Sequence, residues 1–171
     1  ELFDRVVFTG NARQLADCFP GVDELRPFLP QISALRSHGT TSVLCRIDPN
    51  GYSWIYMPSP DHRSHRIICT GNFSRNNNNG DITTATIEFS EKMTEEEIRT
   101  QLKLIPFSPS YLAHHWEEDT YPVQDASSRA LIRELKERLE PRGIYLLGRF
   151  AEWEYYNMDA AIGAAMDLDK R

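Results

Sequence analysis

The stretch that decides the fold lies near the end of the chain and reads Leu146-Leu147-Gly148-Arg149-Phe150-Ala151-Glu152-Trp153-Glu154-Tyr155-Tyr156-Asn157-Met158-Asp159. It predicts a buried strand that ends at Gly148-Arg149, an aromatic loop, and a helix that begins near Asn157 and continues through the alanine-rich residues 160–166. Backbone N–H groups in the first turn of a helix have no partner within the helix, and the helix dipole favours an electron-rich ligand there. The stretch is therefore typical of a ligand-facing strand, loop and helix. In a simpler interpretation, Asn157 or Asp159 is the N-cap of a structural helix.

The Gly-Arg-Phe…Trp…Tyr-Tyr-Asn-Met-Asp pattern of residues 148–159 resembles the C-terminal flavin-binding segment of the UDP-galactopyranose mutases and their relatives in the amine oxidase and protoporphyrinogen oxidase group. The resemblance implies FAD as the cofactor, and it implies cofactor contacts by Gly148, Arg149, Asn157, Met158 and Asp159. Bacterial mutases usually carry Leu-Asp-Met where this chain has Tyr156-Asn157-Met158, whereas eukaryotic ones have an asparagine nearby. Whether Asn157 replaces a functional carboxylate stays open.

A second segment, Arg66-Ile67-Ile68-Cys69-Thr70-Gly71-Asn72-Phe73-Ser74, resembles the mutase segment in which an arginine begins a strand and an Asn-aromatic-Ser group follows. The resemblance implies that Arg66 is catalytic and binds the diphosphate of the substrate, and that Asn72 is a substrate-binding residue. An arginine offers a planar pair of donors for such a group, although a surface salt bridge is the ordinary alternative. Tyr121, in a Thr-Tyr-Pro group, and Tyr155 fall where the family places two phosphate-binding tyrosines.

The resemblance implies an FAD-dependent enzyme that interconverts the pyranose and furanose forms of a nucleotide sugar for cell-surface polysaccharide synthesis. Two alternatives remain open, an FAD-dependent amine oxidase or desaturase and a non-catalytic binding domain. Residues 1–10 contain a charged turn and a short apolar strand without a methionine, and the resemblance implies that the chain is a fragment of a longer flavoprotein and is inactive alone. A complete small domain is the alternative. The expected domains are a strand of the FAD-binding domain at 1–10, a substrate-binding domain at 11–142, and the last strand, loop and helix of the FAD-binding domain at 143–171.

The remaining pattern predicts an α+β fold with an antiparallel sheet of about five to six strands and flanking helices. Helices are expected at residues 12–19, 22–29, 94–104 and 127–139, and strands at 40–47, 52–57, 65–73, 82–89 and 111–119. The turn at 48–51 predicts a hairpin between the first two strands, and the polar residues 74–81 predict an exposed loop. Glu97, three residues after Thr94, completes a capping box, and the leucines at 131, 135 and 139 form one face of the later helix.

Composition limits the other classes of function. The net charge of −6 argues against a nucleic-acid partner, since phosphate binding needs a basic surface. Cys18, Cys45 and Cys69 fit buried free thiols in a reducing compartment. No run of 18 apolar residues occurs, so we expect a cytoplasmic protein without a transmembrane segment. His114 and His115 are neighbours on an expected strand and point to opposite faces, so no metal site is expected. The partner expected is a nucleotide sugar, and a homodimer remains open.

Overall fold

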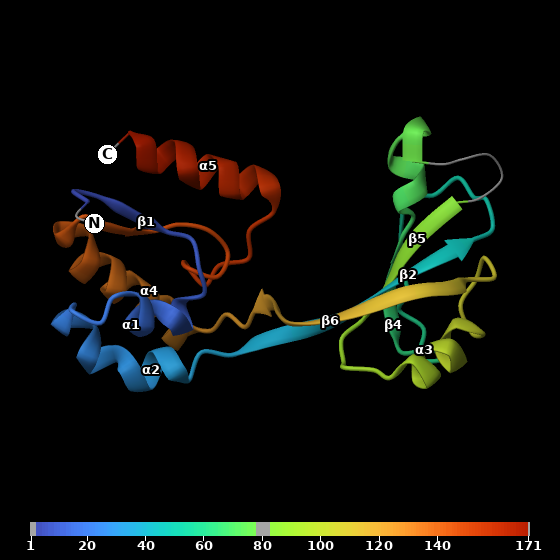
Figure 1. Ribbon diagram of the computed structural model, residues 1–171, viewed down its shortest axis with the longest axis horizontal. Coiled ribbons are helices and arrows are strands. Elements are labelled where there is room, and N and C mark those ends of the chain that lie inside the picture. Colours follow the sequence, from blue (N-terminus) through green and yellow to red (C-terminus); the bar gives the residue numbers. More distant parts are fainter. Residues whose placement is uncertain (1–2, 78–82, 171) are drawn as a thin grey trace. The chain divides into compact units, whose positions relative to one another are not determined.

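The computed structural model describes residues 3–77 and 83–170, and it divides the chain into two compact units (Figure 1). Unit 1 comprises residues 1–37 and 121–171, and unit 2 comprises residues 38–120. Each unit has its own cluster of buried apolar side chains. The α+β class with a five-stranded antiparallel sheet, expected from the sequence, is confirmed. The functional assignment of residues 11–142 to substrate binding stays a prediction.

Unit 1 is built on a parallel pair of strands, β1 (Val6–Phe8) and β7 (Ile144–Leu146). Its α-helices are α1 (Leu15–Cys18), α2 (Leu29–Ser33), α4 (Ala126–Leu139) and α5 (Met158–Asp169). Figure 1 shows α1, α2 and α4 on one side of β1 and α5 on the other. Short 3-10 turns at Ala12–Gln14, Asp23–Phe28 and Glu140–Arg142 complete the unit.

The core of unit 1 forms where α4 packs against the strands and the smaller helices. Leu131, Leu135 and Leu139 are buried, as their helical spacing predicted. Asp125 begins α4, because its carboxylate accepts a hydrogen bond from the backbone N–H of Ser128 at 2.7 Å. Gly143 follows the helix with φ of 74°, a left-handed conformation that favours glycine and turns the chain into β7.

Unit 2 is a sheet with strand order β3-β4-β5-β2-β6. Its strands are β2 (Ser37–Ile47), β3 (Trp54–Tyr56), β4 (Ser64–Ile68), β5 (Thr83–Phe89) and β6 (Ser110–Pro122), and its helix is α3 (Glu95–Leu102). Alternate residues of the strands, such as Val43 and Ile87, form a buried cluster with Ile98 and Leu102 of α3. The helix therefore covers one face of the sheet, and its predicted capping box between Thr94 and Glu97 is confirmed.

Several local expectations were wrong. Residues 40–47 and 52–57 do not form a hairpin, because β2 lies between β5 and β6 while β3 pairs with β4. The physical reason is length: β2 and β5 align over seven residue pairs, whereas β3 has only three residues to offer. The expected strand at 65–73 ends at Ile68 and continues as a 3-10 turn, Thr70–Phe73. In the expected loop 74–81, residues 74–77 are exposed and the rest lie outside the described residues.

The first helices are also shorter than expected. Residues 12–19 form a 3-10 turn and then α1, and residues 22–29 are mostly a 3-10 turn that precedes α2. Pro27 lies inside that turn, where its missing N–H removes a donor for regular α-helix. The three cysteines are free, but Cys18 is exposed, contrary to expectation, because α1 buries only Leu15. Cys45 and Cys69 are buried, as expected.

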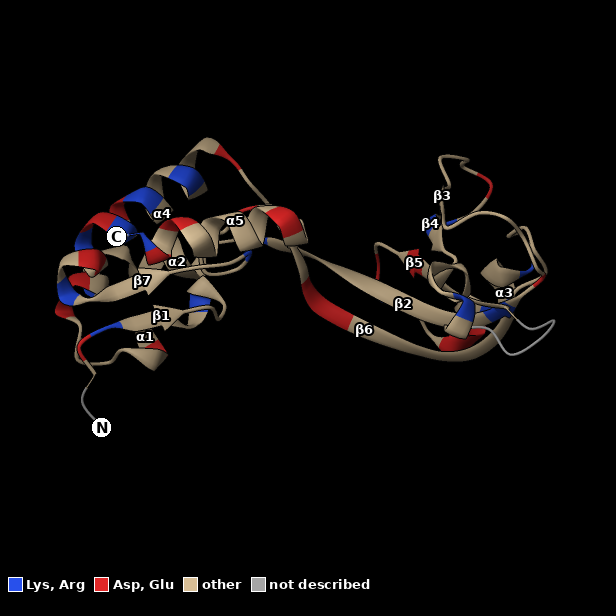
Figure 2. Ribbon diagram, turned by 90° about the horizontal axis from the view of Figure 1, so that it is seen from above, with Lys and Arg blue, Asp and Glu red and all other residues tan. Residues whose placement is uncertain are grey.

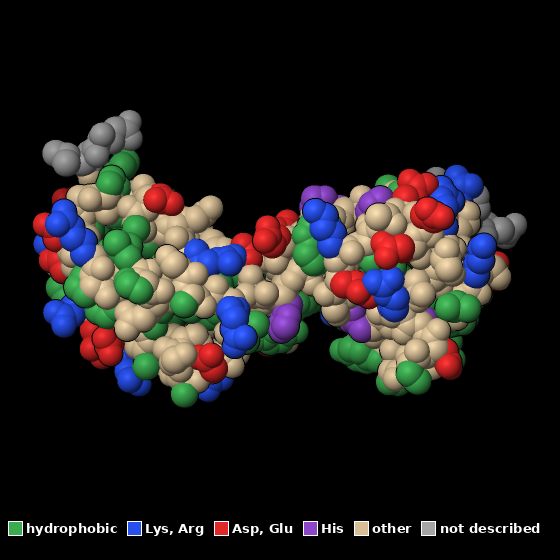
Figure 3. Space-filling view, turned by 90° about the horizontal axis from the view of Figure 1, so that it is seen from below, with side chains coloured by type: hydrophobic (Ala, Val, Ile, Leu, Met, Phe, Trp, Pro, Cys, Tyr) green, Lys and Arg blue, Asp and Glu red, His purple; other side chains and the backbone are tan. Residues whose placement is uncertain are grey.

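Charged side chains are distributed rather than concentrated. Figure 2 shows Lys, Arg, Asp and Glu alternating along α4, and Figure 3 shows both signs interspersed over the face in view. Across residues 3–77 and 83–170, no helix combines the length and the apolar character that a membrane span requires. The cytoplasmic location stays a prediction.

Candidate functional site

The turn at Gly148 joins β7 to the aromatic loop, residues 150–156. Gly148 has φ of 98°, a conformation that L side chains rarely adopt, and a Cβ atom placed there would meet no other atom within 4 Å. The glycine therefore leaves its backbone open to an approaching group. The role of Gly148 in cofactor binding stays a prediction.

Arg149 links this turn to the beginning of α5. Its Nε and Nη2 atoms donate hydrogen bonds to the carbonyl oxygen of Tyr156, at 3.2 and 2.6 Å. The guanidinium also lies over the rings of Tyr121 and Tyr155, at 5.2 and 5.4 Å from their centroids. The two tyrosine rings are stacked, with centroids 5.6 Å apart and an interplanar angle of 22°. The structure thus brings together three of the residues predicted to form the site, which are separated by up to 34 positions in the sequence.

Hydrogen bonds join the aromatic loop to the chain segment that follows Tyr121. The indole N–H of Trp153 donates to the carbonyl of Val123 at 3.2 Å, and the amide of Gln124 donates to the carbonyl of Trp153 at 3.3 Å and to the carboxylate of Glu154 at 2.5 Å. Trp153 is buried although its φ of 50° is unusual for so bulky a residue. Packing and these bonds hold the backbone in that strained conformation, which is typical of functional loops.

The first turn of α5 contains the remaining residues expected to contact the cofactor, Asn157, Met158 and Asp159. Asn157 occupies the N-cap position with an extended backbone, but its side chain makes no capping hydrogen bond. Asn157 is thus the N-cap residue, as in the simpler interpretation, but it lacks the side-chain hydrogen bond that makes such a cap stabilising. Met158 is 85% exposed, and α5 buries none of its residues. The N-terminus of α5 is thus accessible, next to the carbonyl that Arg149 binds.

Glu152 and Lys136 were not identified from the sequence. The carboxylate of Glu152 accepts hydrogen bonds from the backbone N–H of Gly148 at 2.9 Å and from Nζ of Lys136 at 2.5 Å. The spacing of four residues from Gly148 to Glu152 is the available signal, since a side chain can close a turn of that length. No sequence pattern linked Lys136, on α4, to that turn.

Arg66 belongs to unit 2, where it lies in the middle of β4 with its guanidinium 4.9 Å from the ring centroid of Trp54. Its Nε donates to the carboxylate of Glu88, the residue opposite it on β5. A β-bulge between Ser64 and Arg66 allows the consecutive His65 and Arg66 both to reach Glu88, with His65 Nε2 at 3.4 Å. Burial raises the pKa of Glu88, but the hydrogen bonds from His65 and Arg66 outweigh burial and hold that pKa below its ordinary value.

The side chain of Asn72 forms hydrogen bonds to the backbone of a neighbouring segment. Its amide nitrogen donates to the carbonyl oxygens of Asn50 and Tyr52, at 2.9 and 2.7 Å. These bonds fasten the 3-10 turn after β4 to the segment before β3. The predicted contact of Asn72 with a substrate remains a prediction, and the observed bonds give this side chain a local function of its own.

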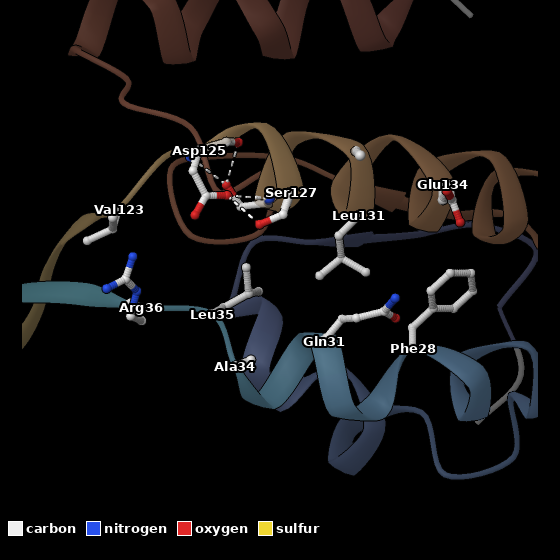
Figure 4. Close-up of a pocket in the computed structure, with 12 residues that line it drawn as sticks. Phe28, Gln31, Ala34, Leu35, Arg36, Val123, Asp125, Ser127, Leu131 and Glu134 are labelled. Atoms are coloured by element: carbon white, nitrogen blue, oxygen red, sulfur yellow. Dashed lines mark hydrogen bonds between the residues drawn. The ribbon is translucent and has the colours of Figure 1, made fainter.

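A cavity of about 330 Å³ lies between α2 and α4 in unit 1 (Figure 4). Its walls combine apolar side chains such as Phe28 and Leu131 with the polar groups of Arg36 and Asp125. The bonds drawn in Figure 4 include those from Ser127 and Ser128 to the carboxylate of Asp125, and they lower the pKa of Asp125 to about 2. None of the site residues expected from the sequence lines this cavity.

The histidine pair on β6 has a local partner as well. Nδ1 of His114 lies 2.7 Å from the hydroxyl oxygen of Tyr111, and His115 lies 3.7 Å from the carboxylate of Glu117. Within the described part of the chain, no group of three or more His, Cys, Asp or Glu side chains is arranged to hold a metal ion.

No family model and no curated protein matches the sequence. Among solved structures, the chain is similar to reduced UDP-galactopyranose mutase, with a TM-score of 0.78 and 18% identity over 100% of this chain and 42% of that chain. A candidate protoporphyrinogen oxidase from Exiguobacterium sp. 255-15 gives a TM-score of 0.68 and 15% identity, covering 99% of this chain and 41% of that one. An oxidoreductase from Methanosarcina mazei gives a TM-score of 0.64 and 10% identity, covering 100% of this chain and 44% of that one. At these identities the likeness concerns the fold, and the resemblance stated from the sequence is confirmed at that level: this chain has the fold of a portion, about 42% in length, of a UDP-galactopyranose mutase.

Proposed function

We propose that this chain is part of an FAD-dependent enzyme that interconverts the pyranose and furanose forms of a nucleotide sugar. The observation that carries the proposal is the cluster of Arg149, Tyr121 and Tyr155 beside the open Gly148 backbone and the accessible start of α5. The likeness of the fold to a UDP-galactopyranose mutase supports the choice of reaction.

The residues of unit 1 fit a flavin. Gly148 offers backbone without a side chain in the way, and the first turn of α5 offers N–H groups to an electron-rich atom. Arg149 adds a fixed positive charge, since its guanidinium is held by the Tyr156 carbonyl. FAD, when bound, supplies the reactive centre, and the protein contributes binding, orientation and electrostatics.

Tyr121 and Tyr155 of unit 1 would bind phosphates of the substrate, and the role proposed for Arg66 of unit 2 is also to bind phosphate. Tyrosine hydroxyls donate hydrogen bonds, and a guanidinium binds phosphate oxygens through paired N–H groups. In this role Arg66 stabilises negative charge as the nucleoside diphosphate leaves. A phosphate would compete with Glu88 for Arg66, because the two groups are already paired.

The test uses the full-length protein. We expect it to bind FAD, to convert UDP-galactopyranose to the furanose form when the flavin is reduced, and to bind UDP competitively with the sugar nucleotide. Chromatography of the products and titration of flavin fluorescence measure these properties. Tyr155→Phe keeps the ring that stacks on Tyr121 but removes the hydroxyl, and should weaken UDP binding. Tyr52→Phe, a change at an exposed ring in unit 2, is the matched control. A full-length protein that binds no FAD contradicts the proposal.

The pairing of Arg66 with Glu88 favours one second candidate, an FAD-dependent amine oxidase. A carboxylate that neutralises Arg66 reduces its attraction for phosphate, and an amine substrate needs no phosphate-binding group at this position. UDP discriminates the two candidates: an FAD-loaded protein that does not bind UDP but oxidises amines supports the second.

A further inference from the structure

The carboxylate of Glu152 is buried beneath the Gly148 turn, with only 8% of its side chain exposed. One carboxylate oxygen accepts a hydrogen bond from the backbone N–H of Gly148 at 2.9 Å, and the other accepts a hydrogen bond from Nζ of Lys136 at 2.5 Å. The backbone N–H of Glu152 in turn donates to the carbonyl of Gly148 at 2.9 Å. Both backbone polar groups of Gly148 are therefore bound by a single residue.

Glu152 also acts on the far end of the aromatic loop. Burial raises the pKa of Tyr156 to about 12, and the charge of Glu152 and a hydrogen bond to it add to this effect. Arg149 binds the carbonyl of the same Tyr156. The carboxylate thus connects α4 to the Gly148 turn, which directly precedes Arg149 in the chain, and Arg149 is bound on its other side by the carbonyl of Tyr156.

A carboxylate is chemically suited to this position. A buried charge is costly unless it is paired and hydrogen-bonded, and Lys136 with the Gly148 N–H provides both. Glutamine would still accept the N–H of Gly148, but it would leave the Lys136 ammonium without its anionic partner. Alanine would remove the acceptor altogether and leave the backbone N–H of Gly148 without this hydrogen bond.

We propose that Glu152 is a positioning residue for the cofactor site: through Gly148 and Tyr156 it holds Arg149 in the orientation in which Arg149 meets its ligand. The inference rests on the proposed flavin site. Glu152 does not touch the ligand in this role, and Lys136 serves to neutralise it.

The experiment compares variants of the full-length protein near pH 7, at a temperature below every melting transition. Glu152→Ala should weaken FAD binding by about tenfold or more, because a loosened turn misplaces Arg149. The double variant Glu152→Gln with Lys136→Met keeps an acceptor for Gly148 and removes the unpaired ammonium, so its FAD affinity should stay close to that of the wild type. Glu24→Ala is the matched control, since it removes another ion pair of unit 1, Glu24 with Arg142.

Two readouts separate the possible failures. FAD affinity reports on the cofactor site, and near-ultraviolet circular dichroism of the protein without FAD reports on the packing of Trp153 and the stacked tyrosines. If Glu152→Ala lowers the melting temperature as Glu24→Ala does, yet leaves FAD affinity and the dichroism unchanged, Glu152 is merely structural and the inference is wrong. If the wild type binds no FAD, the proposed function fails, and an unchanged dichroism in Glu152→Ala then overturns the positioning role as well. If Glu152→Ala does not fold, the double variant decides: loss of FAD affinity in that variant overturns the inference.

Discussion

At the scale of single residues, Arg66 shows how a side chain's surroundings change its expected behaviour. From the sequence, Arg66 would stand at the beginning of a strand with few contacts, so its removal should affect stability little. In the structure it lies within β4, its side chain is 14% exposed, and it binds Glu88 and packs on Trp54. Removing Arg66 therefore leaves the buried Glu88 carboxylate with fewer partners, which is destabilising.

If the proposed function holds, we predict that Arg66→Ala in the full-length protein lowers kcat/KM by roughly 30- to 1000-fold, equivalent to about 2 to 4 kcal/mol of transition-state stabilisation. It should also lower the melting temperature. Arg66→Lys should recover part of the activity, because lysine keeps the charge without the planar pair of donors. Steady-state kinetics and thermal denaturation measure the two effects. Arg46→Ala, at an exposed arginine paired in register with Thr84, is the control. Unchanged turnover in a folded Arg66→Ala variant rules out the catalytic role.

At the scale of elements, the bulge in β4 brings the side chains of His65 and Arg66 to the same carboxylate, Glu88, on one face of the sheet. Neighbouring residues of a regular strand point to opposite faces, so His65 and Arg66 would not normally share a partner. The irregular register between Ser64 and Arg66 lets both bind Glu88. β4, β5 and the Trp54 ring of β3 are thereby joined by polar contacts on the face opposite the one that α3 covers.

We predict that this arrangement makes unit 2 less stable in acid. The folded-state pKa of Glu88 is lowered, so its contribution to stability is present above the ordinary carboxyl pKa of about 4.5 and is lost as the pH falls through the lower folded-state pKa. Glu88→Gln removes this contribution at every pH. The difference in melting temperature between wild type and Glu88→Gln should therefore be largest above about pH 5 and should shrink toward pH 3. A difference that is constant across this range would contradict the assignment.

At the scale of the whole chain, the parallel pair of β1 and β7 differs from the antiparallel sheet of unit 2. Parallel sheets generally have more than two strands and are covered on both faces. Among the described residues of unit 1 only these two strands form such a sheet, and Val7 at its centre is 48% exposed. The apolar residues Met158, Ile162 and Met166 of α5 are exposed too, at helical spacing.

We predict that the 171-residue chain by itself binds FAD weakly and purifies colourless. A dinucleotide-binding fold holds the pyrophosphate at a glycine-rich turn between a parallel strand and a helix, and no such glycine pattern occurs in this sequence. Bound flavin is measured by absorbance at about 350 to 500 nm, and the affinity for FAD is measured by titration with added FAD. Stoichiometric yellow flavin on this chain would show that residues 148–159 hold the cofactor without further support.

The sequence by itself determined the elements whose signals are local. The Thr94 capping box, the leucine face of α4 and the strand, loop and helix around Gly148 could all be read from residue type and spacing, because each depends on contacts within one or two turns. The likeness to the mutase fold was also readable, since its motif lies in one continuous stretch.

Only the tertiary structure decided which distant segments meet. Neither the pairing of β1 with β7 nor the place of β2 between β5 and β6 follows from local pattern, because strand order depends on the total length of ladder that each arrangement forms. The same holds within the site. Tyr121 stacks on Tyr155 and Lys136 reaches Glu152 because the core of unit 1 packs α4 beside the aromatic loop, and no spacing in the sequence encodes that contact.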